Sequence, residues 1–158
     1  MKKCILILSG LLLTFLSSKA QIVTSGDVLN LAGKTEVNVV FDYSETNLIR
    51  TDKTVEELVE SNSKFAKAKD KQELYFIGSL NDDTKGIFEF GDYKKPQANL
   101  YIKVSRIQND MNNPRFKAVF TDSEDSEIVT IEGIEQEDLN DAGHELGKFL
   151  YKKLKKVK

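Results

Sequence analysis

The sequence has few of the residues that most often build reactive sites. Its 158 residues include one cysteine, one histidine, two prolines and no tryptophan. Cysteine and histidine supply most ligands of a four-coordinate zinc site, so a zinc centre is not expected. The 23 basic and 25 acidic residues are nearly balanced, which argues against the basic footprint of a nucleic-acid-binding protein. We therefore expect neither a cofactor nor a nucleic-acid partner.

The N-terminus has the layout of a secretory signal peptide. Lys2 and Lys3 precede an apolar stretch over residues 4–16, and Ser18-Lys19-Ala20 has the small-x-small form of a signal-peptidase site. The stretch is shorter than the roughly 20 apolar residues that a membrane-spanning helix needs. We predict a signal peptide over 1–20 that meets the membrane only transiently. A single domain over 21–158 is expected in the periplasm or outside the cell.

The lone cysteine precedes the apolar stretch, whereas the lipidated cysteine of a lipoprotein follows it. Cys4 therefore predicts no lipid anchor. Cleavage after Ala20 leaves 138 residues without cysteine, so the core must provide the stability without disulfides. Cleavage also removes three lysines and no acid, which leaves 20 basic and 25 acidic residues and a formal charge of −5.

Alternating apolar and polar residues predict four strands, at 34–43, 100–105, 116–121 and 127–134. Residues 21–33 are expected to form a short leading strand or an ordered arm, and 87–90 form a short apolar piece. The last three strands have short connections, which is typical of an antiparallel meander with one covered face.

Two helices are expected to provide that cover. Thr54 and Glu57 form a capping box, and helical spacing continues to Asn81, with a break expected near Asp70. A strand at Glu73–Ser79 is the alternative, since aromatic and β-branched residues favour strands. The last helix is expected over 136–156. These elements predict an α+β fold of order β-α-(β)-β-β-β-α, with a mainly antiparallel sheet of three to five strands and helices on one face.

Three short motifs imitate functional sites and lack essential parts. Gly33-Lys34-Thr35 resembles the end of a nucleotide-binding loop, but Val28 replaces the required glycine and a strand follows. His144 has Lys148 where a zinc-protease helix has its second histidine, so we expect an exposed histidine on a lysine-rich face. Residues 122–127 carry four acids without the glycine and distal glutamate of a calcium loop. A solvated hairpin tip is expected there, with calcium binding as the alternative.

Three segments carry a resemblance. The lysine-rich start ending in Ser18-Lys19-Ala20-Gln21, the strand Val37–Tyr43 and the closing Leu146–Leu150 resemble small exported proteins of unknown function from gut-type Gram-negative bacteria. The element order is also similar to envelope α+β domains of lipoprotein adaptors and secretion accessories. This resemblance implies an envelope location and transfers no site residue.

Together these features favour an exported, non-enzymatic binding or adaptor module whose partner is a protein or an envelope polymer. Contact is expected in the loops 43–52 and 109–113, or on an uncovered sheet face. The candidate contact residues are Tyr43, Tyr101, Lys103, Asn109 and Asn112. The alternative is a hydrolase that cleaves glycan or peptidoglycan with two carboxylates about 5–9 Å apart in a cleft.

Overall fold

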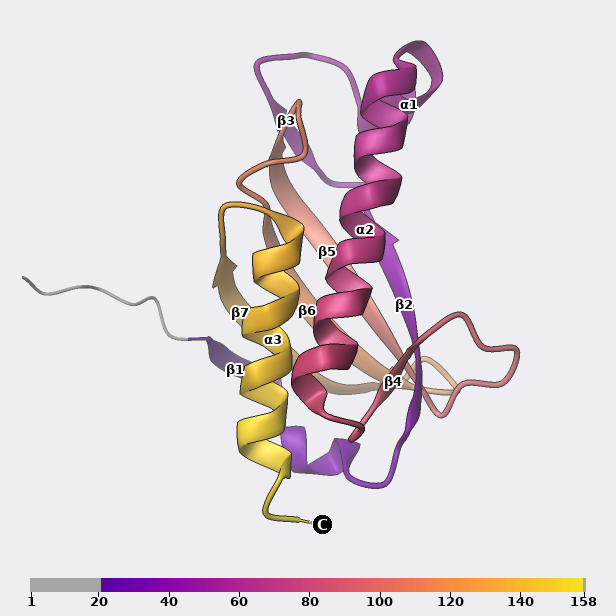
Figure 1. Ribbon diagram of the computed structural model, residues 1–158, viewed down its shortest axis with the longest axis vertical. Coiled ribbons are helices and arrows are strands. Elements are labelled where there is room, and N and C mark those ends of the chain that lie inside the picture. Colours follow the sequence, from indigo (N-terminus) through magenta and orange to yellow (C-terminus); the bar gives the residue numbers. More distant parts are fainter. Residues whose placement is uncertain (1–20, 158) are drawn as a thin grey trace, which may run out of the picture.

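The computed structural model describes residues 21–157, and the predicted signal peptide at 1–20 lies outside them. Figure 1 shows one sheet with its helices packed in front of it. The strands are β1 (Ile22–Gly26), β2 (Glu36–Asp42), β3 (Asn47–Ile49), β4 (Glu89–Gly91), β5 (Ala98–Gln108), β6 (Arg115–Asp122) and β7 (Glu127–Glu135). The helices are η1 (Val28–Leu31, a 3-10 helix), α1 (Val55–Ser61), α2 (Ser63–Thr84) and α3 (Leu139–Leu154).

The sheet is mixed and has seven strands in the order β1-β7-β6-β5-β2-β4, with β3 pairing β5 beyond the end of β2. Strands β5, β6, β7 and β1 are antiparallel neighbours, whereas β2 runs parallel to both β5 and β4. The α+β class is confirmed, but the expected mainly antiparallel sheet of three to five strands is imprecise, because the sheet has seven strands and three of its six strand pairs are parallel. Strands β1, β3 and β4 are too short to show a clear alternation, so their pairing depends on the tertiary structure.

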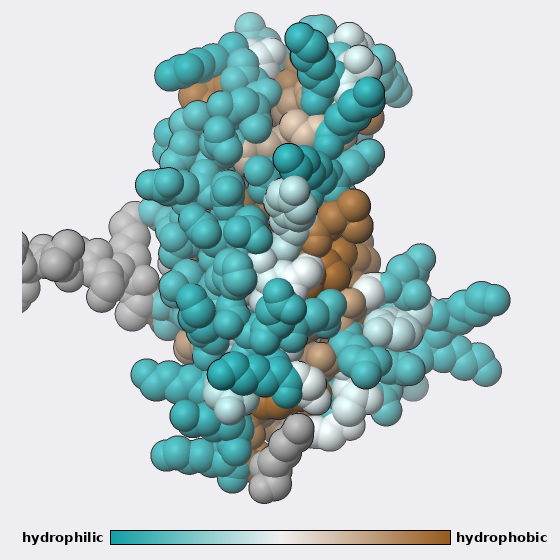
Figure 2. All heavy atoms as spheres, in the orientation of Figure 1, coloured by the Kyte–Doolittle hydropathy of each residue, from teal (hydrophilic) through white to brown (hydrophobic). Residues whose placement is uncertain are grey.

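All three α-helices lie on one face of the sheet (Figure 1). Beneath them, the inward side chains of β5 and β6 form the centre of the core, and those of α3 close it from above. The fully buried members include Leu100, Ile102, Ala118, Phe120, Leu146 and Leu150. On their outer side the helices are mostly hydrophilic (Figure 2). The strands predicted at 100–105 and 116–121 and the helix predicted at 136–156 are therefore confirmed, and their apolar residues face the core.

Helices α2 and α3 pack closely because glycines of α3 face the backbone of α2. A Cβ placed on Gly143 would lie 2.6 Å from the Phe76 carbonyl oxygen, and one on Gly147 would lie 2.8 Å from the Asp83 Cβ. Beside Gly143, the Ser79 hydroxyl donates a hydrogen bond to the Asn140 Oδ1 at 2.6 Å across the same interface. Side chains larger than hydrogen at these two positions would push the helices apart.

The first long helical segment breaks at Asn62, so the break expected near Asp70 is wrong. Asn62 has an extended backbone (φ −139°), and its side-chain oxygen accepts hydrogen bonds from the Lys64 and Phe65 amides. An asparagine in this role satisfies the first amides of α2, which starts a new helix and ends α1. The alternative of a strand at Glu73–Ser79 is also wrong, because these residues lie inside α2.

None of the helices within residues 21–157 is long and apolar enough to span a membrane.

Candidate binding face

The sheet face opposite the helices carries the candidate site. Within residues 21–157 no helix lies on this face, and its side chains alternate with the buried ones of the core. We call it the open face. Its central members are Val40, Asp42, Tyr101, Lys103, Ser105, Arg106, Arg115, Lys117, Val119, Thr130 and Glu132.

A groove of about 740 Å³ crosses the open face at one end of β5, β6 and β7. Two irregularities in strand pairing lie along it. The register between β5 and β6 shifts between Val104 and Arg106, and that between β6 and β7 shifts between Phe116 and Ala118. Gly133 sits at the second shift with φ +80°, a backbone conformation that favours glycine. The small residues Ser105 and Gly133 leave space between the long charged side chains that line the groove.

Like charges face each other across the two central strands. Lys103 pairs with Lys117, and Arg106 pairs with Arg115, in directly opposite positions of β5 and β6. Like charges in such positions destabilise a sheet. The four cations are all exposed, so water reduces this repulsion without removing it.

Each of these like-charge pairs has an acidic residue beside it on the next strand. Asp42 pairs with Lys103 from β2, and Glu135 pairs with Arg115 from β7. The Arg115 Nε lies 3.1 Å from the Glu135 Oε1, which makes a partly exposed ion pair. The groove is thus basic in its middle and acidic at both sides.

Two ionisable groups of the open face have shifted pKa values with local causes. Hydrogen bonds from the Ser44 hydroxyl and amide, and then the charge of Lys103, hold the pKa of Asp42 below its ordinary value. The Tyr101 hydroxyl donates to the Asp125 Oδ1 at 2.8 Å, which raises the pKa of Tyr101. A general acid of a glycosidase needs a raised carboxyl pKa, and Asp42 has the opposite shift.

The five predicted contact residues lie in three different places. Tyr101 and Lys103 share the open face, as the interpretation of an uncovered sheet face requires. Asn109 and Asn112 lie in the turn between β5 and β6, where Asn112 donates to the Asp110 carboxylate at 3.0 Å. That turn follows the end of β5 and is separate from the groove lining.

Tyr43 is buried, with only 7% of it exposed, and it faces the helices rather than the open face. Alternation along β2 puts it on the side of Val37, and its ring stacks on Phe41 at 6.4 Å between centroids. Burial, and then the Glu73 carboxylate, raise its pKa above the ordinary tyrosine value. The loop predicted at 43–52 also contains β3, which pairs with β5.

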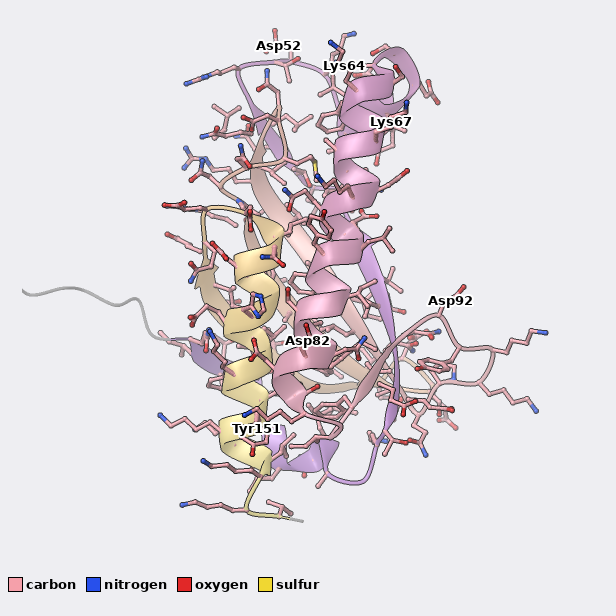
Figure 3. The ribbon with its side chains drawn as sticks, viewed as in Figure 1. Asp52, Lys64, Lys67, Asp82, Asp92 and Tyr151 are labelled. Carbon is pink, nitrogen blue, oxygen red and sulfur yellow. The ribbon has the colours of Figure 1, made fainter. Side chains whose placement is uncertain are left out.

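The sequence predicted an exposed histidine on a lysine-rich face, but His144 is only partly exposed and contacts α2. Its Nδ1 lies 2.6 Å from the Asp83 Oδ2, so it joins α3 to α2. Asp82 beside it is exposed (Figure 3), whereas Asp83 is committed to this contact. The spacing of residues along α3 correctly places His144 on the face of Lys148, but it cannot show that α2 packs beside this face.

The acidic turn at 122–127 uses its carboxylates internally. The Asp122 Oδ1 accepts from the Glu124 and Ser126 amides, and Asp125 accepts from Asn99 and Tyr101. In the described part of the chain, no three histidine, cysteine or acidic residues gather as metal ligands would. The Gly33–Thr35 segment forms a turn that leads into β2, with no helix after it.

Sequence reasoning missed Arg106, Arg115 and Lys117 as site residues. Lys117 already stood on the outward side of a predicted strand, opposite Lys103 in a short antiparallel pair. Arg106 could not be placed because the shift at Ser105 turns it toward the open face, and Arg115 lies just before the strand predicted at 116–121. A bulge of this kind leaves no clear mark in the sequence.

No family model and no curated protein matches the chain. The structure is similar to that of PelC from Paraburkholderia phytofirmans, solved as a dodecamer, with a TM-score of 0.43 and 15% identity over 84% of this chain and 96% of that one. A variant of the same protein gives a TM-score of 0.43 and 14% identity over 85% and 95% of the two chains. Likeness at this level transfers no functional residue, and the chain is assigned to no family.

Proposed function

We propose that this protein is an exported, non-enzymatic binding module of the cell envelope, periplasmic or secreted and not lipid-anchored. Its groove holds a charged segment of a partner protein or envelope polymer. The observation that carries the proposal is the placement of Lys103 opposite Lys117 in the groove and of Arg106, which lies just beyond the groove lining, opposite Arg115. Four exposed cations in two like-charge pairs cost stability, and a ligand with negative groups between the pairs would remove that cost.

The shape of the groove supports the same conclusion. Its floor is open backbone and small side chains, and its charged walls come from four different strands. Side chains held on a sheet are positioned more firmly than side chains on loops, so they suit recognition. Acids at both sides of the basic middle would select a segment whose own charges alternate.

The predicted hydrolase has less support. Glu135 is engaged by Arg115, and the pKa of Asp42 is shifted away from the range that a proton donor needs. Glu132 and Glu45 also line the groove, so acids are present there. Release of sugar or peptide fragments from purified peptidoglycan would nevertheless replace the binding proposal with the hydrolytic one.

Position-specific photo-crosslinking tests the binding face. A photoreactive phenylalanine analogue replaces Tyr101 on the open face, and in a matched protein it replaces Tyr75, which is 49% exposed on α2. We expect a covalent adduct in cells from position 101 and none from position 75. A protease-sensitive adduct identifies a protein partner, and a protease-resistant one identifies a polymer.

Charge reversal then shows whether the cations hold the partner. Lys103→Glu with Lys117→Glu should abolish the adduct at position 101. Lys64→Glu with Lys67→Glu, which makes the same charge change on α2, should leave it intact. Equal yields from positions 101 and 75, or an adduct that survives reversal of the groove lysines, would refute this function.

A further inference from the structure

The end of the molecule formed by the last turns of α3 is strongly basic. Residues 146–157 contain no acid and include five exposed lysines, which are Lys148, Lys152, Lys153, Lys155 and Lys156. Lys85 joins them from the C-terminal cap of α2, because its ammonium lies 4.9 Å from the centre of the Tyr151 ring. Tyr151 itself lies near the lower end of the view in Figure 3. We call these six lysines and Tyr151 the basic end.

Exposed apolar side chains lie at the same end. Helix η1 contacts α3 there, and Val157 follows the end of α3 (Figure 1). Leu29 of η1 is 47% exposed and Val157 is 53% exposed, whereas their neighbours Leu31 and Leu154 are buried. The buried Leu31 and Leu154 anchor the two segments whose exposed side chains are Leu29 and Val157.

A helix C-terminus favours cations, but this effect explains only some of the lysines at the basic end. The helix dipole acts within the last turn, whereas Lys148 lies earlier in α3 and Lys85 belongs to another helix. The dipole also gives no reason for the exposure of Leu29. Acids at the margin include Asp82 and Asp83 on α2, Glu145 on α3, and Asp27, which caps η1 by accepting from the Leu29 amide.

The charge distribution gives the molecule an orientation. Without the six lysines of the basic end, the remainder of residues 21–158 has 14 basic and 25 acidic residues, or −11. An anionic surface therefore attracts the basic end and repels the rest of the chain. Tyr151 adds an amphipathic ring, held between Lys85 and Lys155 at 4.9 and 5.7 Å.

We propose that the basic end docks this protein reversibly on the surface of a bilayer that contains anionic lipids. The lysines contact the headgroups, and Leu29 and Val157 enter the interface beside them. A soluble polyanion would satisfy the lysines but leave the two apolar side chains in water, so the combination fits a lipid surface better. Docking is independent of the groove, which lies on the sheet face that α3 does not cover.

Vesicle co-sedimentation tests the docking. The sample is residues 21–158, which contain the whole core described above, and its fold is first checked by circular dichroism. Vesicles of phosphatidylcholine with phosphatidylglycerol should sediment the protein at low salt, and vesicles of phosphatidylcholine alone should not. Raising the salt should release it, because Lys and headgroup charges are screened.

Two sets of variants separate the charge and apolar contributions. Lys152→Gln, Lys153→Gln, Lys155→Gln and Lys156→Gln together should raise the lipid concentration at half-binding by about several hundredfold, since each lysine contributes roughly fivefold near an anionic surface. Leu29→Ser should weaken binding by about threefold without a change in charge. The control replaces Lys64, Lys67, Lys94 and Lys95 with Gln, and Lys64 and Lys67 lie at the opposite end (Figure 3).

The control variant should bind as the unmodified protein does. Absence of sedimentation with the anionic vesicles would overturn the proposal. An equal loss of vesicle binding in the control variant would also overturn it. So would binding to soluble polyphosphate that Leu29→Ser leaves unchanged while the vesicles stay unbound, since the ligand would then be a soluble polyanion. A variant that loses its fold would show a lowered melting temperature. Because Leu29 is exposed, Leu29→Ser should keep the fold, and its vesicle binding is then compared directly with that of the unmodified protein.

Discussion

Single residues set the distance between the two long helices. Gly143 meets the Phe76 carbonyl so closely that its hydrogen is the largest substituent that fits, although glycine is a poor helix former. Gly78 lies on α2 with nothing within 4 Å of an added Cβ. The same residue type is thus required at one helical position and dispensable at another.

Alanine at these two glycines should change stability in opposite directions. Gly143→Ala should lower the free energy of unfolding by about 1–3 kcal/mol, because the new methyl group overlaps α2. Gly78→Ala should raise it by up to about 1 kcal/mol, since alanine favours the helix and its methyl group meets only solvent. Urea denaturation of both variants measures this. A Gly143→Ala protein as stable as Gly78→Ala would show that the helices do not pack as described.

At the scale of elements, strand β4 is held as much by side chains as by the sheet. It has three residues and pairs only with the start of β2. Asn81 of α2 donates to the Phe90 carbonyl at 3.0 Å and accepts from the Phe90 amide at 2.8 Å, as a neighbouring strand would. Asn38 binds the Tyr93 amide and carbonyl in the same manner.

Removal of the Asn81 amide should loosen β4 selectively. Asn81→Ala leaves the amide and carbonyl of a buried residue without partners, which should cost about 1–3 kcal/mol. Hydrogen exchange at the Phe90 amide should become much faster, while exchange in the centre of β5 should change less. Asn47→Ala, at an exposed position at the start of β3, is the control. Unchanged protection at Phe90 would contradict this role.

For the whole molecule, the two proposed surfaces lie on different sides of one core. The groove opens on the sheet face, and the basic end lies at the close of α3 on the helix side. A protein docked by the basic end would therefore keep the groove accessible to a partner. This arrangement agrees with the proposed envelope location, which itself depends on cleavage after Ala20.

Export can be tested at the cleavage site. The mature protein recovered from a Gram-negative host should begin at Gln21 by N-terminal sequencing and intact mass. Ala20→Arg should block processing, because the peptidase accepts small residues there, and the chain should retain residues 1–20. Ser18→Ala keeps a small residue and should be processed normally. Recovery of full-length protein in the cytoplasm would refute export.

Much of the architecture was determined by the sequence, because it depends on local patterns. Alternation placed the inward residues of β5 and β6, helical spacing placed the buried stripe of α3, and the capping box at Thr54 started α1. It also placed Tyr101 and Lys103 on an outward side. These patterns act over a few residues, so no distant partner is needed to recognise them.

The tertiary structure decided what depends on partners distant in the sequence. The parallel pairing of β2, the contact of His144 with Asp83 and the burial of Tyr43 each join residues more than two dozen positions apart. The turn of Arg106 toward Arg115 depends on a bulge that alternation does not show. Because the candidate groove is built from four strands brought together in this way, the sequence supplied its charges and the fold supplied its shape.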